Sequence, residues 1–229
     1  MFIRSTSGEA QTRMTTQQKI DELNKIAEEI KAFKGLDIAK NVKHPVPGEG
    51  NPDAKILFIG EAPGQVEDGS GRPFVGRSGQ MMRTVLTETT GIQPDEVFIT
   101  NIVKYRPPDN RDPFDNEIEA CRDWLDRQIA VIRPKIIVTL GRFSMAKFIP
   151  GVTISRVHGI PRNIQLTTDN LQLNVTVFPI FHPAAALRGT GTMMQFRQDF
   201  VKLHSLINPP APITPKPTEP EVPAQASLF

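Results

Sequence analysis

The chain has 229 residues, of which 38% are hydrophobic and 23% are charged. That length is sufficient for one sizeable core and too short for two large domains, and the composition is typical of a soluble globular protein. The formal net charge is only +2, so a nucleic-acid-binding surface would have to be a local basic patch. The single cysteine, Cys121, excludes an internal disulfide. No apolar run is long enough to span a membrane, and we expect a cytoplasmic monomer.

Four segments differ in composition. Residues 1–14 are polar and aperiodic, and we expect them to be disordered. Residues 15–207 carry all the helix and strand signals and form the one folded domain. Residues 208–224 contain seven of the 21 prolines, which predicts an extended tether. The last five residues, 225–229, follow this tether as a separate short peptide.

The folded segment alternates between helical and strand patterns. Apolar residues at helical spacing follow Thr15, which has a capping-box partner in Gln18, and predict a first helix that ends near Gly35. Later patterns predict strands at 55–59, 97–101, 135–140 and 175–181, and helices at 78–89, 115–132, 143–149 and 193–206. This alternation predicts an α/β fold, a three-layer α/β/α sandwich with a central, mainly parallel four-stranded sheet.

The loop after the first strand is rich in glycine and contains an acidic pair and an aromatic residue. Its sequence, residues 60–79, is GEAPGQVEDGSGRPFVGRSG. Open α/β sheets bind ligands at the carboxyl ends of their strands, and glycine lets the backbone approach a ligand closely. Neither the P-loop nor the dinucleotide fingerprint fits. On composition alone, an ordinary strand-to-helix connection fits equally well.

This loop is also the first of four motifs that resemble family 4 uracil-DNA glycosylases. The other three are NIVKYRPPDNRDP from Asn101, KIIVTLG at 135–141, and FHP at 181–183 followed by AAALR. Their order and spacing agree with the family over roughly residues 31–205. The resemblance implies a monofunctional enzyme that flips uracil out of DNA, hydrolyses its N-glycosidic bond and so initiates base-excision repair in the nucleoid.

Three residues would contact the base if the resemblance holds. His182 would donate a hydrogen bond to uracil O2, where negative charge develops as the base leaves. Asn101 would pair with the N3–H and O4 of uracil through its amide, and Phe74 would stack on the ring. Each residue alone also fits a structural role: a loop histidine before proline, an asparagine at a strand end, or a buried aromatic.

Three further residues would line the same pocket. Glu61 and the neighbouring backbone would help to hold the leaving base, and Glu67 would lie near uracil C5. Ala62 occupies the position where other glycosylase families carry a water-activating acid or amide. The general base therefore stays open between Glu61 and a water held by backbone groups.

A second group of residues would contact the DNA. Leu187 and Arg188 lie on the loop that enters the duplex once the base is out. Candidate phosphate contacts are the basic side chains in the motif loops, namely Arg72, Arg77, Lys104, Arg106 and Arg111.

Of the four iron–sulfur cysteines typical of the family, this chain has only the fourth. By alignment with the motif context, the first two positions are Lys31 and Lys34, the third is Tyr105 and the fourth is Cys121. A [4Fe–4S] cluster needs four thiolates, so we expect no cluster, no metal and no other cofactor. We expect Tyr105, Cys121 and the first helix to pack together instead.

The last five residues resemble the short peptide by which bacterial repair and replication proteins bind the sliding clamp. Gln225 would hydrogen-bond in one pocket, and Leu228 and Phe229 would fill an apolar one. The expected partners are therefore uracil-containing DNA and the sliding clamp, without a membrane. The alternative function is a uracil or damaged-base binder, weak or inactive in catalysis, that the clamp recruits.

Overall fold

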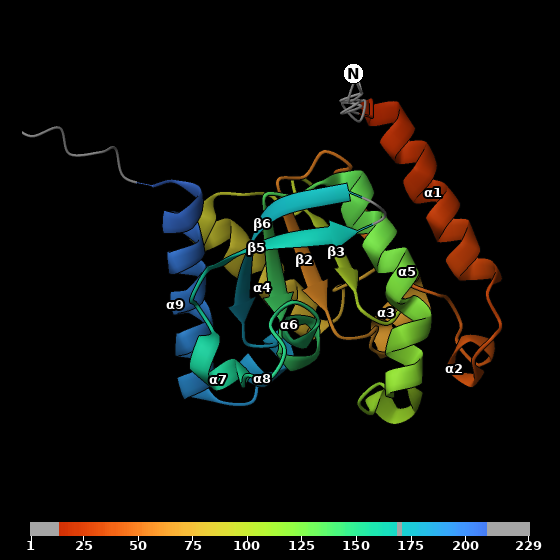
Figure 1. The fold of residues 1–229 in the computed structure, drawn as a ribbon. Helices are drawn as coiled ribbons and strands as arrows, with labels where there is room; N and C mark the ends of the chain where they lie inside the picture. Colours follow the sequence, from red (N-terminus) through yellow and green to blue (C-terminus); the bar gives the residue numbers. More distant parts are fainter. Residues whose placement is uncertain (1–13, 169–170, 210–229) are drawn as a thin grey trace, which may run out of the picture.

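The computed structural model describes residues 14–168 and 171–209 (Figure 1). The expected clamp peptide, nearly all of the tether and residues 1–13 lie outside the described residues. Within the described part, six strands form a single sheet in the order β1-β3-β2-β4-β6-β5. Their bounds are β1 Glu49–Gly50, β2 Ile56–Gly60, β3 Phe98–Asn101, β4 Ile136–Leu140, β5 Arg162–Thr168 and β6 Leu171–Ile180.

The four central strands, β3-β2-β4-β6, are parallel, as predicted. The prediction of four strands was wrong, because β1 and β5 extend the sheet at its two edges in antiparallel pairing. β1 has only two residues, and β5 is the polar sequence RNIQLTT with mostly exposed or half-buried side chains. Neither carries the apolar run by which a buried strand is recognised, and pairing with β5 also makes β6 longer than expected.

Helices pack against both faces of the sheet (Figure 1). Alternate residues of β2 point to opposite sides: Ile56 and Phe58 belong to one core cluster, and Leu57 and Ile59 to the other. The first cluster includes apolar residues of α4 (Arg77–Thr90) and α9 (Thr190–Ile207). The second includes those of α1 (Thr16–Ala32) and α5 (Asp115–Ile132), which lie side by side.

The long helices match the predicted segments closely. α5 has the predicted bounds, and α1 begins with the predicted capping box, in which Thr15 and Gln18 bond each other's backbone. The other α-helices of the described chain have four to seven residues, and most of them are too short to give a periodic signal: α2 Asp37–Lys40, α3 Gln65–Ser70, α6 Arg142–Phe148, α7 Ile154–Val157 and α8 Pro183–Ala186. A short 3-10 helix, η1, spans Pro108–Asn110. None of the described helices has the length and apolar character needed to cross a bilayer.

Candidate active site

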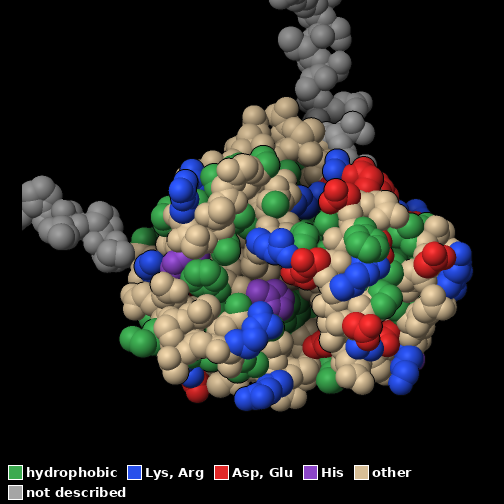
Figure 2. All heavy atoms as spheres, turned by 90° about the horizontal axis from the view of Figure 1, so that it is seen from below, with side chains coloured by type: hydrophobic (Ala, Val, Ile, Leu, Met, Phe, Trp, Pro, Cys, Tyr) green, Lys and Arg blue, Asp and Glu red, His purple; other side chains and the backbone are tan. Residues whose placement is uncertain are grey.

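A cavity of about 590 Å³ lies at the carboxyl ends of the four parallel strands. Figure 2 shows this side of the molecule, where basic and acidic side chains are interspersed around a central histidine. All six residues expected to line the base pocket lie in the wall of this cavity, together with Arg188: Glu61, Ala62, Glu67, Phe74, Asn101 and His182. The four motifs that are far apart in sequence thus meet in one place, because their strands are neighbours in the sheet.

Asn101 ends β3 and is 1% exposed. Its side-chain oxygen Oδ1 is buried and accepts no hydrogen bond from any of the described residues. A buried polar atom without a partner is costly, so this oxygen is available for a donor that enters the cavity. The backbone beyond it is fixed, because the N–H groups of Ile102 and Val103 donate to the carbonyls of Gly60 and Glu61 at 3.0 Å each.

Phe74 lies next to Asn101 in the wall of the cavity. A Cβ atom at Gly60 would come within 2.3 Å of Asn101 Oδ1 and 2.4 Å of Phe74 Cζ, so only glycine permits this close approach. Phe74 itself has a left-handed backbone, with φ of 53°, which is uncommon for a bulky residue. Its ring centroid lies 6.2 Å from that of His182.

The tautomer of His182 follows from its position at the start of α8. His182 is the N-cap of this helix, and its Nδ1 accepts a hydrogen bond from the backbone N–H of Ala184 at 3.2 Å. Nδ1 must therefore carry the lone pair, and the ring proton of the neutral imidazole lies on Nε2. The side chain can thus donate from Nε2 to a group in the cavity.

The environment of His182 keeps its ring neutral. Burial, followed by the positive charge of Arg188, lowers the pKa of His182 to about 4, against a smaller opposing effect of Glu67. Because this pKa lies below the ordinary value of 6.5, the imidazole stays uncharged at neutral pH. The histidine is therefore a neutral hydrogen-bond donor rather than a cation.

Glu61 follows β2 and faces an ion pair at the cavity wall. Burial raises the pKa of Glu61, the nearby Asp112 carboxylate raises it further, and Arg142 opposes these effects. Asp112 and Arg142 form a salt bridge with each other, and both also line the cavity. A carboxylate with a raised pKa is a stronger proton acceptor than an ordinary one.

Glu67 is 9% exposed and is hydrogen-bonded to the loop that follows Phe74. Its Oε1 accepts hydrogen bonds from the backbone N–H groups of Val75 at 3.0 Å and Gly76 at 2.8 Å. The carboxylate therefore forms a fixed part of the cavity wall. Its role in positioning the loop was not foreseen from the sequence.

Of the expected DNA contacts, Arg188 and Arg77 have exposed side chains and Leu187 is half-buried. Arg188 lies at the cavity, directly after α8. Arg111 also lines the cavity and pairs with Glu117.

Lys104 does not lie where a phosphate contact requires. Its side chain is 0% exposed, and Nζ donates to Thr100 Oγ1 and Asn101 O at 2.7 Å each and to Gln128 Oε1 at 2.8 Å. Burial lowers its pKa to about 7. The expectation of a DNA contact was therefore wrong: three acceptors from β3 and α5 retain the ammonium group inside the protein.

Arg72 and Arg106 are both bound to neighbouring side chains. Arg72 forms a two-point interaction with Glu49 on the edge strand β1, and Arg106 donates to Asn110 Oδ1 at 2.8 Å. Neither contributes to the cavity wall. Sequence reasoning also missed Asp112 and Arg142, which do line it. Asp112 lies within the second motif and Arg142 directly follows the third, and their charge was the available signal.

The place expected for a cluster is filled by packed side chains. Tyr105 is 0% exposed, its hydroxyl donates to Ile30 O at 2.7 Å, and its ring lies against those of Phe33 and Trp124. Cys121 is also fully buried, in the same hydrophobic core as Tyr105. Burial raises the pKa of its thiol.

The remaining positions expected for a cluster are occupied by lysines. The exposed Lys31 pairs with Glu28, and Lys34 donates to Ala39 O at 3.3 Å. Across the described residues, no three His, Cys, Asp or Glu side chains are grouped to hold a metal ion.

Comparison with known proteins shows which family the sequence resembles. The profile of the uracil DNA glycosylase superfamily matches residues 47–203. The type-4 uracil-DNA glycosylase of Sulfurisphaera tokodaii is 44% identical over 200 residues, which cover 86% of this chain and 88% of that protein. The type-4 enzyme of Saccharolobus solfataricus is 42% identical, covering 82% and 88%, and that of Thermotoga maritima is 38% identical, covering 85% and 98%. The chain therefore belongs to the uracil DNA glycosylase superfamily, in its type-4 family.

Proposed function

We propose that this protein removes uracil from DNA by hydrolysing the N-glycosidic bond, the first step of base-excision repair. One observation carries the proposal: a buried acceptor without a partner, Asn101 Oδ1, shares a cavity with the neutral donor His182 Nε2 and the ring of Phe74. An acceptor, a donor and an aromatic face are what a flipped uracil requires at N3–H, at O2 and along its ring.

The bond to uracil would break with its electron pair moving onto the base. The uracil anion then carries negative charge on N1 and O2, while the sugar carbon C1′ becomes electron-deficient. A hydrogen bond from His182 Nε2 to O2 strengthens as this charge develops, so it stabilises the transition state more than the bound substrate. A water oxygen finally bonds to C1′ and loses one proton.

We assign Glu61 the role of holding this water and accepting its proton. The side chain lies in the cavity wall, and its raised pKa favours proton transfer to it. Ala62 next to it offers no polar group. The alternative noted above, a water held by backbone groups alone, predicts that Glu61 can be replaced at little cost.

The DNA would be held by residues at the mouth of the cavity. Arg188 and Leu187 follow α8, and we assign them the role of entering the space left by the flipped base. Arg77 at the start of α4 is a further exposed candidate for a phosphate contact.

An excision assay tests the proposal. A labelled oligonucleotide with one uracil is incubated with the protein, and alkali then cleaves at abasic sites; a thymine oligonucleotide serves as control. We expect uracil-dependent cleavage, and a rate lower by about 100- to 1,000-fold for His182→Ala, because one donor to the leaving base is lost. His204→Ala, in α9 away from the cavity, should retain the wild-type rate.

A folded wild-type protein that binds uracil DNA without cleaving it would overturn the proposed activity. The same result would support the alternative function, a binding protein for uracil or damaged bases.

We also propose that this protein works without an iron–sulfur cluster. The donor set does not fit one, because the four expected positions offer one thiol, one phenol and two lysines. Supporting this, the phenol is engaged with Ile30, and the thiol is buried among apolar side chains.

Finally, we propose that the chain has four parts: residues 1–14, the catalytic domain 15–207, the tether 208–224 and the clamp-binding peptide 225–229. The sequence Gln-Ala-Ser-Leu-Phe supports the last assignment. A synthetic peptide of residues 208–229 should bind a bacterial sliding clamp, and the same peptide with Leu228 and Phe229 replaced by alanine should not. Equal binding of the two peptides would contradict the assignment.

A further inference from the structure

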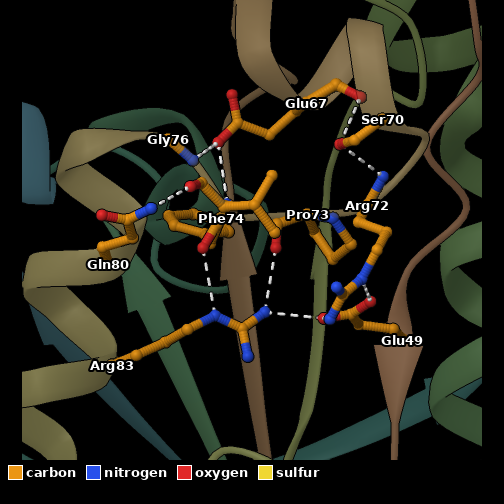
Figure 3. A network of polar contacts seen from close by, with 10 residues as sticks. Glu49, Glu67, Ser70, Arg72, Pro73, Phe74, Gly76, Gln80 and Arg83 are labelled. Carbon is orange, nitrogen blue, oxygen red and sulfur yellow. Dashed lines mark hydrogen bonds and ion pairs between the residues drawn. The ribbon is translucent and has the colours of Figure 1, made fainter.

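The backbone that carries Phe74 is held from two sides, as Figure 3 shows. Side chains of α4 bind three successive carbonyl groups: Arg83 Nη2 donates to Pro73 O at 2.9 Å, Arg83 Nε to Phe74 O at 3.0 Å, and Gln80 Nε2 to Val75 O at 2.9 Å. From the other side, Glu67 accepts the next two N–H groups. Side chains thus bind five backbone groups of residues 73–76, whereas loop backbone commonly lies at the surface.

This loop has to be held because its conformation is strained. Phe74 has a φ of 53°, a region that a residue with a Cβ atom enters at an energetic cost. A Cβ atom at Gly79 would come within 2.2 Å of the Phe74 backbone, so α4 packs directly under the strained residue. Strain of this kind persists only where the surrounding structure determines the conformation.

Arg83 is itself fixed by charge. Its Nη2 lies 2.8 Å from Glu49 Oε1, and the two side chains are 18% and 27% exposed. Glu49 belongs to β1, the short edge strand, and also binds Arg72. The carboxylate thus orients the planar guanidinium, whose remaining donors then match the two carbonyls, a geometry that a lysine cannot reproduce.

We propose that Arg83 is a positioning residue for uracil excision, which acts by holding Phe74 in the orientation that presents its ring to the flipped base. Arg83 is absent from the cavity wall, so it acts through Phe74 rather than on the base or the reacting atoms. The inference rests on the proposed function, since it assigns Phe74 the stacking role. It also gives the two-residue strand β1 a role, because this strand supplies Glu49.

A double-mutant cycle tests this inference. Single-turnover excision rates at saturating enzyme are measured for wild type, Arg83→Met, Phe74→Ala and the double variant, together with affinity for DNA that lacks uracil. We expect Arg83→Met to lower the rate by about 10- to 100-fold without changing that affinity, and to lower it little further when Phe74 is already alanine. Arg83→Lys should recover part of the loss. Arg197→Met removes an exposed pair between α9 and α4 and should leave the rate unchanged.

Two results would overturn the inference. One is a wild-type excision rate for folded Arg83→Met. The other is that Arg83→Met lowers the rate by the same factor in wild type and in Phe74→Ala. If Arg83→Met does not fold, Glu49→Gln provides a milder form of the same test, with a smaller loss that again depends on Phe74.

Hydrogen exchange separates this inference from the proposed activity. The amides of Val75 and Gly76 should exchange faster in Arg83→Met than in wild type, whether or not uracil is excised. Unchanged exchange at both amides would show that Arg83 does not hold the loop. An inactive wild type would instead contradict the proposed function.

Discussion

Glu61 is the residue whose protonation should set the lower pH limit of activity. A carboxyl group can accept a proton from water only when ionised, and burial followed by the charge of Asp112 raises the pKa of Glu61 above its ordinary value of 4.5. The excision rate should therefore fall as the pH drops through this raised pKa. His182, whose pKa burial lowers to about 4, stays neutral above that pH.

The Asp112–Arg142 ion pair allows this assignment to be tested in two directions. Asp112→Asn removes a negative charge, which lowers the pKa of Glu61, so activity should persist to lower pH. Arg142→Met removes a positive charge, which raises that pKa, so the loss of activity on acidification should begin at a higher pH. The measurement is the single-turnover rate at saturating enzyme across the pH range.

Glu61→Gln completes the series. Its rate at neutral pH should fall by about 100- to 10,000-fold, the range of a general base. The further decrease of the rate at low pH, the acid limb of the pH–rate profile, should disappear. If Glu61→Gln keeps both the rate and the limb, a water held by backbone groups is the better account. The assignment would also be contradicted if Asp112→Asn and Arg142→Met shifted the acid limb of the pH–rate profile in the same direction.

At the same scale, Lys104 shows where reasoning from sequence is incomplete. Its motif suggested a phosphate contact, whereas the structure buries it against Thr100, Asn101 and Gln128. The acceptor from α5 is 24 residues away in the chain, and a motif does not reveal such a partner. By contrast, Asn101 and His182 both lie in the cavity wall, because Asn101 ends one recognisable strand, β3, and His182 lies just beyond another, β6.

At the scale of elements, Tyr105 joins the β3 loop to the end of α1. The last carbonyls of a helix have no partner within it, and Ile30 O, in the last turn of α1, instead accepts a hydrogen bond from the buried Tyr105 hydroxyl at 2.7 Å. Tyr105→Phe leaves this carbonyl buried and unpaired, so the free energy of unfolding should fall by about 1–3 kcal/mol. Urea denaturation at neutral pH measures the change.

Thr168→Val is the matched control. The Thr168 hydroxyl also donates to a helix carbonyl, that of Asp126 at 2.8 Å, but Asp126 lies inside α5 and its carbonyl keeps its partner within the helix. The loss should therefore be smaller than for Tyr105→Phe. Equal losses would indicate that the end of α1 does not depend on the Tyr105 hydroxyl.

The elements that could be predicted are those with a long apolar pattern. α5 was predicted with its observed bounds because 18 residues repeat one apolar face. β5 was missed because pairing with β6, rather than burial of its own side chains, makes it a strand. The network around Phe74 was missed for a related reason, since Glu49 and Arg83 are 34 residues apart and neither belongs to an apolar pattern.

At the scale of the whole molecule, the parallel sheet brings motifs that are far apart in sequence together at one edge. The residues after β2, β3, β4 and β6 are adjacent because these strands are neighbours in the order β3-β2-β4-β6. Two helices on each face bury the strands, so the four loops project from a rigid base. The residues at the positions expected for the family's cluster belong to α1, the segments that follow α1 and β3, and α5, and none of them lines the cavity.

The protein should therefore fold and act without iron. Protein purified without oxygen should contain far fewer than four iron atoms per chain and show no visible absorption of a cluster, and a chelator should leave its melting temperature and excision rate unchanged. Cys121 then has only a packing role, so Cys121→Ala should retain excision while losing some stability. Iron near four atoms per chain, lost together with stability on chelation, would contradict the proposal, because it would require ligands other than the one thiol that the chain contains.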